Sequence, residues 1–314
     1  MSTKLSVLVT GGAGFLGSHL CDKLLKKNYQ VFCIDNFYSS HIENIEIFKN
    51  NPNFIFLEQD VCNINFDYKI DQIYNLACPA SPIHYQSDPV KTIQTNILGS
   101  INVLELAKKN KAKILQASTS EVYGDPTVSP QIESYWGNVN PIGIRSCYDE
   151  GKRAAETLFF DYNRQYGLNI KVCRIFNTYG PNMAKNDGRV ISNFIVQALD
   201  NKNLSIYGDG SQTRSFCYVD DLINGLMQVM NTEDSFVGPI NLGNDLELSI
   251  KDIAKKVIDL SNSKSSIEYL MPVSDDPMQR KPDLTLAKNI IDWKPKVGID
   301  KGISFTIDYF KNQL

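Results

Sequence analysis

The sequence predicts an α/β protein with a doubly wound parallel sheet and a smaller C-terminal region. Two observations carry this prediction. Short β-branched or aromatic runs alternate with segments of helical periodicity through the first half of the chain, and a glycine-rich turn follows the first of these runs. Such alternation is typical of parallel strands that are joined by helices on both faces of one sheet.

Six strands are expected in the first half, because each run is short and rich in β-branched or aromatic residues. They lie near residues 4–10, 30–35, 53–57, 71–76, 112–118 and 170–176. Apolar residues recur at helical spacing between these strands. Helices are therefore predicted, most clearly over residues 15–28, 90–110 and 147–166.

The second half of the chain is less regular. Turn-rich pieces interrupt helices that are expected near residues 188–201, 219–231, 249–262 and 283–292. The segment Pro239–Leu242 could return as a strand to the main sheet. We therefore predict a first domain over residues 1–176, with a return near 215–243, and a mainly substrate-binding region over residues 177–314.

Composition is ordinary for a globular protein, with 42% hydrophobic and 21% charged residues among 314. A net charge of −3 gives no reason to expect binding to nucleic acid or to an anionic membrane. Residues 1–10 contain no leader pattern, and no uncharged apolar run approaches the length of a membrane span. We therefore expect a cytoplasmic protein. The seven cysteines and three histidines show no metal-ligand spacing, so no metal site is predicted.

A glycine-rich segment, Gly11-Gly-Ala-Gly14-Phe15-Leu16-Gly17, follows the first expected strand and opens the first helix. Glycines allow a tight turn and let the backbone approach a pyrophosphate, which the amides at the helix N-terminus can bind. A glycine trio alone is weak evidence. The strand before it and the helix after it indicate a dinucleotide site of the Rossmann type.

Asp35 ends the second expected strand, where its carboxylate can accept hydrogen bonds from the ribose hydroxyls of adenosine and repel a 2′-phosphate. The turn that follows, Asn36–Ser40, contains no arginine or lysine to hold that phosphate. NAD is therefore favoured over NADP, with Asn36 among its contacts. After the third strand, Asp60 and Val61 stand where an adenine edge could bind, although Asp60 could equally be a strand-end cap.

Tyr148 and Lys152 lie four residues apart on an expected helix and so share one of its faces. A phenol near an ammonium group is a good general base for a sugar hydroxyl, because the positive charge favours the phenolate. Such a pair is common on solvated helices, so the spacing alone is weak evidence for catalysis.

The glycine loop, the Asn-Leu76-Ala77 after the fourth strand and the Tyr148/Lys152 pair together resemble the extended short-chain dehydrogenase/reductases that act on nucleotide sugars. This resemblance implies that Leu76 and Ala77 contact the cofactor and that Lys152 binds the nicotinamide ribose. It also implies that Thr119 hydrogen-bonds the sugar 4-hydroxyl while Tyr148 removes its proton. Thr119 could instead be a turn hydroxyl that bonds its own backbone.

Eight motifs, spread over nearly the whole chain, narrow the resemblance to the UDP-glucuronic acid decarboxylase family. They lie at residues 77–82, 118–124, 135–141, 147–153, 174–181, 187–190, 208–216 and 275–283. The resemblance implies that UDP-glucuronate is converted to UDP-xylose through a UDP-4-keto intermediate, with NAD recycled in the site. It also implies a homodimer, formed through the helices near 90–110 and 147–166.

By the same resemblance, Glu121 is expected beside the sugar C5 and its leaving carboxylate, and Arg280 is expected to orient the substrate or assist protonation. The alternatives are a surface acid and a structural salt bridge. Tyr207 could stack on uracil or fill the core. The full set of expected UDP-sugar contacts is Tyr85, Asn177, Arg189, Tyr207, Gln212, Arg214 and Arg280.

Several other reactions use a similar scaffold. Nucleotide-sugar 4,6-dehydratases carry an aspartate before the glutamate, whereas this chain has Ser120, a poor acid. A 4-epimerase and an oxidative decarboxylase that releases the keto pentose with NADH remain alternatives, as does a non-catalytic NAD-sensing protein. The chain also departs from the family pattern at Cys78, where serine is common, and in the turn Tyr38–Ser40, which contains no glycine.

Overall fold

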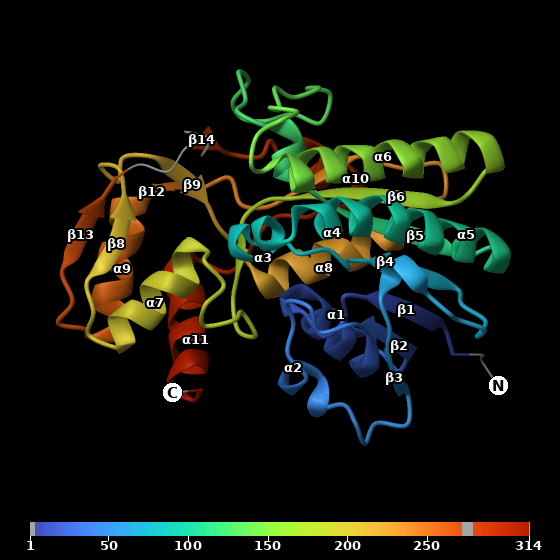
Figure 1. The fold of residues 1–314 in the computed structure, drawn as a ribbon, viewed down its shortest axis with the longest axis horizontal. Helices are drawn as coiled ribbons and strands as arrows, with labels where there is room; N and C mark the ends of the chain where they lie inside the picture. The colour runs from blue at the N-terminus through green and yellow to red at the C-terminus, as the bar shows by residue number, and fades with distance from the viewer. Residues whose placement is uncertain (1–3, 272–278, 314) are drawn as a thin grey trace.

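A computed structural model describes residues 4–271 and 279–313. Seven parallel strands form the central sheet in the order β11-β6-β5-β4-β1-β2-β3 (Figure 1), and the predicted doubly wound α/β fold is confirmed. Their bounds are β1 Ser6–Thr10, β2 Gln30–Asp35, β3 Phe54–Glu58, β4 Gln72–Asn75, β5 Lys113–Thr119, β6 Ile170–Ile175 and β11 Ile240–Leu242. The segment predicted to return to the sheet is therefore its edge strand β11, whereas the division of the chain near residue 176 stays a prediction.

The sheet is covered on both faces, because consecutive apolar residues of its strands point to opposite faces and both faces are therefore apolar. Leu8 of β1 packs in one buried cluster with Phe159, whereas its neighbours Val7 and Val9 pack in another with Leu24. The first cluster involves α5 and α6, and the second involves α1 and α8, which flank the sheet in Figure 1. These helices span Phe15–Lys26 (α1), Ser100–Asn110 (α5), Ser146–Tyr166 (α6) and Val219–Met230 (α8).

The helix predicted over 90–110 is interrupted. It consists of α4, a π-helical turn and α5, and the separate short helix α3 precedes it. Their bounds are Pro82–Ser87 (α3), Pro89–Gln94 (α4) and Thr95–Gly99 for the π turn. Periodicity could not reveal this, because a single π turn changes the spacing of the apolar residues by only one position.

The C-terminal half gathers at one end of the sheet (Figure 1), where two small sheets, β8-β13 and β12-β9-β14, pack with three helices. Their strands are β8 Leu204–Tyr207, β9 Thr213–Ser215, β12 Glu247–Ser249, β13 Ile267–Leu270 and β14 Gln279–Arg280. The helices are α7 Val190–Leu199, α9 Ile250–Ser261 and α11 Ile299–Lys311. These short strands were not predicted, because two to four residues carry no measurable periodicity. The helix α11 was not predicted either, although Ile299, Ile303 and Ile307 recur in it at helical spacing. Residues 275–278 of the last motif lie outside the described residues.

The remaining elements are short. They are α2 Glu43–Glu46, η1 Val61–Asn63, η3 Ser120–Tyr123, β7 Thr178–Tyr179, β10 Cys217–Tyr218 and α10 Thr285–Ile291. Among the residues that the structure describes, no helix combines the length and apolar character needed to cross a membrane.

Replacing Phe159 tests the packing of α6 on the sheet. Its side chain is fully buried, so Phe159→Ala should reduce the free energy of unfolding by about 3–5 kcal/mol through lost burial and a residual cavity. Urea unfolding followed by circular dichroism measures this loss. Phe305→Ala on α11, where the side chain is 43% exposed, should cost less than half as much. Equal losses would contradict this packing.

Candidate active site

A large cavity of about 940 Å³ opens along the carboxyl ends of the central strands. Its walls include the segments that follow β1, β2, β4, β5 and β6, together with α6 and parts of the C-terminal half. Every site residue that the sequence analysis named lines this cavity. Parallel strands explain the convergence, because their carboxyl ends meet at one edge of the sheet.

The glycine loop is packed so closely that side chains would not fit. A Cβ atom at Gly17 would lie 2.1 Å from the Gly11 carbonyl oxygen, and Gly11 itself has φ +66°. Gly14 is the N-cap of α1 and provides no side-chain cap, so the first amides of the helix remain available to a ligand. The tight turn and these amides fit the pyrophosphate of a dinucleotide.

Asp35, at the end of β2, is hydrogen-bonded to the glycine loop. Its carboxylate accepts hydrogen bonds from the Ala13 amide at 2.9 Å, the Phe37 amide at 3.0 Å and the Ser40 hydroxyl at 2.7 Å. A carboxylate offers about four acceptor positions, so one is left for a ribose hydroxyl. Ser40 was singled out only as part of an unusual turn, and its contact with Asp35 shows how that turn closes.

Asp60 is a cap, one of the two roles that the sequence left open, because its carboxylate accepts a hydrogen bond from the Cys62 amide at 2.8 Å at the start of η1. It also lines the cavity, so the adenine contact stays a prediction. Lys91 pairs with the same carboxylate, and Asn36 donates to it at 3.2 Å. Lys91 was not predicted. It comes from α4, and its approach to Asp60 depends on the tertiary fold.

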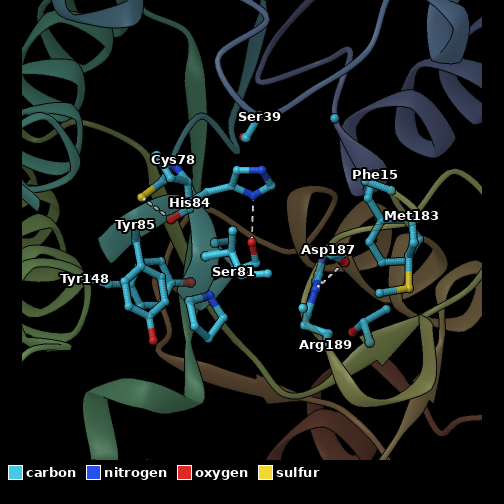
Figure 2. A pocket seen from close by; sticks show the side chains of 18 of the residues that line it. Phe15, Ser39, Cys78, Ser81, His84, Tyr85, Tyr148, Met183, Asp187 and Arg189 are labelled. Atoms are coloured by element: carbon cyan, nitrogen blue, oxygen red, sulfur yellow. Dashed lines mark hydrogen bonds and ion pairs between the residues drawn. The ribbon is translucent and has the colours of Figure 1, made fainter. Parts of the chain in front are cut away.

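Tyr148 and Lys152 are both buried on the face of α6 that meets the end of β5. Lys152 Nζ donates to the Ala117 carbonyl at 2.9 Å and lies 5.8 Å from the centre of the Tyr148 ring. The ring of Tyr85 stacks on that of Tyr148, with centroids 5.1 Å apart, and Figure 2 shows the two rings overlapping. Thr119 Oγ1 accepts from the Glu121 amide at 3.3 Å, so the turn contact considered for it is present.

Burial raises the pKa of the Tyr148 phenol well above its usual value, and a hydrogen bond with Thr119 lowers it only in part. This net direction is opposite to the one that the tyrosine–lysine spacing alone predicts, and that prediction was wrong for the protein without ligands. Lys152 is itself so buried that desolvation lowers its pKa. Loss of water around the phenol therefore outweighs the nearby ammonium group.

Glu121 is held between two arginines. Arg280 from β14 contacts both carboxylate oxygens, at 2.6 and 2.7 Å, and Arg145 at the start of α6 contacts one of them. Both Glu121 and Arg280 are at least 92% buried, so Glu121 is not a surface acid, and the salt bridge that was considered for the pair does exist. Arg145 was missed, although it lies one helical turn before Tyr148 and lines the same cavity.

The remaining predicted contacts also line the cavity. Tyr207 is half exposed, which excludes the core-filling alternative, and Gln212 donates to its carbonyl at 2.8 Å. Arg214 is buried beside them. Arg189 pairs with Asp187 and lies 5.5 Å from the centre of the Phe15 ring, so its guanidinium reaches the glycine-loop side, as Figure 2 shows.

Asn177 lines the cavity just after β6, and its carbonyl accepts from the Cys217 amide at 2.9 Å. Cys78, which replaces the expected serine, also lines the cavity, and burial raises the pKa of its thiol. Within the described ranges, no group of three or more histidine, cysteine or acidic side chains could hold a metal ion.

Residues 7–243 match the NAD dependent epimerase/dehydratase family. The chain belongs to this family. Within it, the chain is 51% identical over 310 residues to UDP-glucuronic acid decarboxylase 4 of Arabidopsis thaliana, covering 99% of this chain and 69% of the relative. It is 50% identical over 308 residues to UDP-glucuronic acid decarboxylase 1 of Xenopus tropicalis, covering 98% of this chain and 72% of the relative. The predicted resemblance to these decarboxylases is confirmed.

Members of the epimerase/dehydratase family with solved structures share the whole fold. UDP-glucuronic acid 4-epimerase from Bacillus cereus, solved with UDP-glucuronic acid and NAD, is 31% identical, with a TM-score of 0.88 over 99% of this chain and 100% of that one. UDP-glucose 4-epimerase from Thermotoga maritima, solved with UDP-glucose, is 29% identical, with a TM-score of 0.89 over 98% and 99%.

The raised pKa of Tyr148 can be measured directly. In NAD-free protein, phenolate absorbance at 295 nm is expected to show no contribution from Tyr148 below pH ~10, since burial disfavours the anion. The contribution is the difference between the titrations of the wild type and Tyr148→Phe. A phenolate that appears between about pH 7 and 9 and disappears in Tyr148→Phe would contradict this result.

Proposed function

We propose that this protein is an NAD-dependent UDP-glucuronate decarboxylase that forms UDP-xylose. The observation that carries the proposal is the position of Glu121 and its two arginines in the same cavity as Tyr148 and Thr119. A site that only oxidises a sugar hydroxyl needs no second set of charges. A site that also acts on a sugar carboxylate needs a second set of charged groups to bind it. The relatives named as decarboxylases support this interpretation.

The reaction follows from elementary carbonyl chemistry. Oxidation of C4 of the glucuronate places a ketone β to the carboxylate on C5. The C5–carboxylate bond can then break with its electron pair moving into an enolate, and CO₂ leaves. C5 takes up a proton, and reduction of the C4 ketone gives UDP-xylose with no net oxidation.

The cofactor half of the cavity fits NAD. Its pyrophosphate would lie on the amides of the glycine loop from Gly11 to Gly17, its adenosine near Asp35 and Asp60, and its nicotinamide ribose near Lys152. The further contacts Phe15, Leu16, Asn36, Val61, Leu76 and Ala77 line the same half. When bound, NAD⁺ supplies a hydride acceptor for C4 and a positive charge close to the phenol.

Tyr148 takes the proton of the sugar 4-hydroxyl, and Thr119 holds that hydroxyl in place. Thr119 can do so while accepting from the Glu121 amide, because its hydroxyl retains a donor and another acceptor position. Tyr85 covers the other face of the Tyr148 ring and keeps water from it. The buried phenol is neutral before the ligands bind, which prevents an unpaired anion in the empty site.

Arg280 and Arg145 receive the sugar carboxylate, which competes with Glu121 for their guanidinium groups. Because Glu121 is already paired, its negative charge opposes binding less than an isolated carboxylate would. Once CO₂ has left, the arginines return fully to Glu121. The two arginines thus bind the sugar carboxylate when the substrate enters, and they still have Glu121 as a partner after that carboxylate has left as CO₂.

The uridine diphosphate lies in the part of the cavity that Tyr207, Gln212 and Arg214 line. Arg214 suits the diphosphate because a guanidinium makes paired, charge-assisted hydrogen bonds. The half-exposed ring of Tyr207 stacks on uracil, with Gln212 fixing its backbone. Asn177 contacts the nucleotide from the end of β6, and Arg189 lies where it can serve either diphosphate.

An epimerase is the second candidate, favoured by the fold shared with UDP-glucuronic acid 4-epimerase. The lower identity to that protein, 31% against 51% to a decarboxylase, speaks against it. Ser120, which is buried at the position of the dehydratase acid, speaks against dehydration. A homodimer and a cytoplasmic location stay predictions.

Incubation of the purified protein with UDP-glucuronate should yield CO₂ and UDP-xylose in equal amounts, without accumulation of NADH. Tyr148→Phe should lower kcat by about 10²–10⁴-fold, because the general base is lost. Tyr166→Phe, on the exposed part of the same helix, should leave kcat unchanged. Ion chromatography measures UDP-xylose, trapping measures the released CO₂, and absorbance at 340 nm measures any NADH. Net NADH with a keto sugar would favour the oxidative decarboxylase instead.

Arg280→Gln tests whether this arginine binds the sugar carboxylate or the diphosphate. Affinity for UDP-glucuronate should fall by about 30-fold or more, since a buried charged contact is lost, while affinity for UDP-glucose stays within about threefold. Calorimetry on the NAD-loaded Tyr148→Phe protein measures both. Arg164→Gln, an exposed position on α6, is the matched control. Equal losses for the two ligands would assign Arg280 to the diphosphate.

A further inference from the structure

Asp149 is a second buried carboxylate next to the proposed site, and none of the roles above uses it. It follows Tyr148 on α6, is only 7% exposed and does not line the cavity. Its Oδ1 atom is buried with no hydrogen-bond partner in the described part of the chain. Its Oδ2 atom lies 3.9 Å from Nε of Arg145, which does line the cavity.

Asp149 completes a group of four charges. Two guanidinium groups, Arg145 and Arg280, face two carboxylates, Glu121 and Asp149. Glu121 has both oxygens paired, whereas Asp149 has one loose ion pair and one bare oxygen. Asp149 is the carboxylate of this group that can be protonated, because its Oδ1 atom makes no hydrogen bond within the described residues.

A bound glucuronate adds a third carboxylate to this group. It brings one more negative charge into a buried group, which is costly where water is excluded. Protonation of one acid offsets that added charge. Both oxygens of Glu121 already contact arginine, so the proton goes to Asp149, the carboxylate that has the weaker partners.

We infer that Asp149 takes up a proton when the sugar carboxylate binds to Arg145 and Arg280, and releases it when that carboxylate leaves as CO₂. This inference rests on the proposed function. Asp149 is a positioning residue, because it acts through Arg145 and does not touch the substrate. Its proton allows the third carboxylate to enter the buried group without adding to the net charge of that group.

The electrostatics of Asp149 in the ligand-free protein agree with this role. Burial and, after it, the charge of Glu121 raise the pKa of Asp149, the two arginines lower it, and the net pKa is about 7. An added carboxylate raises the pKa in the same direction as Glu121 does. The titratable or charged groups that face Asp149 from α3, η3, α6 and β14 are Tyr85, Glu121, Arg145, Cys147, Tyr148, Glu150 and Arg280.

Uptake and release of a proton by Asp149 leave the overall proton balance of the reaction unchanged. When the C5–carboxylate bond breaks, the electron pair passes to C5 and the freed position takes one proton, so each turnover consumes one. Asp149 binds one proton as substrate enters and gives one up as the carboxylate departs. The group of four charges therefore ends each turnover in the state in which it began.

Proton uptake can be counted by calorimetry in buffers that differ in heat of ionisation. NAD-loaded Tyr148→Phe protein, which binds without turnover, should take up about one proton per UDP-glucuronate at pH ~8 and almost none at pH ~6, where Asp149 is already protonated. UDP-glucose, which has no carboxylate, should cause no uptake at either pH. Uptake at pH ~8 should vanish in Tyr148→Phe/Asp149→Asn.

Asp161→Asn in the same background is the matched control, because Asp161 lies on α6 with a side chain 55% exposed, and this variant should keep the uptake. Binding of UDP-glucuronate without uptake, or uptake that persists in Asp149→Asn, would overturn the inference. Failure of Tyr148→Phe to bind UDP-glucuronate at all would overturn the proposed function instead.

A second measurement needs no Asp149 variant. In the Tyr148→Phe protein, affinity for UDP-glucuronate should fall by up to about tenfold per pH unit above pH ~7, because the required proton becomes scarce. Affinity for UDP-glucose should stay constant. The same slope for both ligands would assign the proton to another group and overturn the inference.

Discussion

The ion pair between Glu121 and Arg280 is the contact on which the sugar end of the cavity depends. The two residues are 159 positions apart in the chain and both are buried. Buried charges are stable only when they are paired, so each residue fixes the other. Through Arg145, the same pair is tied to the start of α6, two turns before Lys152. The end of β5, the strand β14 and the tyrosine helix are therefore held in one arrangement.

The parallel sheet supplies the other half of this arrangement. Its register brings the ends of β1, β2, β4 and β5 to one edge, so the glycine loop, Asp35 and Thr119 open into a single cavity. In the proposed reaction, oxidation at C4 and bond cleavage at C5 concern neighbouring carbons. A cavity in which Tyr148 and Glu121 both meet the sugar suits this requirement, because neither step needs the substrate to move.

Sequence alone predicted the parts of the site that are local in the chain. The glycine loop and the Tyr148/Lys152 pair lie within one turn or one helix, and strand ends such as Asp35 follow from the parallel topology. Arg145 was missed, and Asp149 was noticed only as part of a motif and given no role of its own, because the importance of both comes from Glu121 and Arg280, which only the tertiary fold brings near. The predicted direction of the Tyr148 pKa shift was wrong because burial outweighs the neighbouring lysine. The spacing of two residues in a sequence does not reveal how deeply they are buried.

The central claim is that one site removes the carboxylate and restores the C4 hydrogen. A proton NMR time course with UDP-glucuronate in D₂O tests it most directly. The account predicts UDP-xylose with one deuterium at C5, which is protonated from solvent, and with the original hydrogen at C4, which never leaves the site. UDP-galacturonate without deuterium at C5, or a 4-keto pentose that accumulates with NADH, would contradict the account.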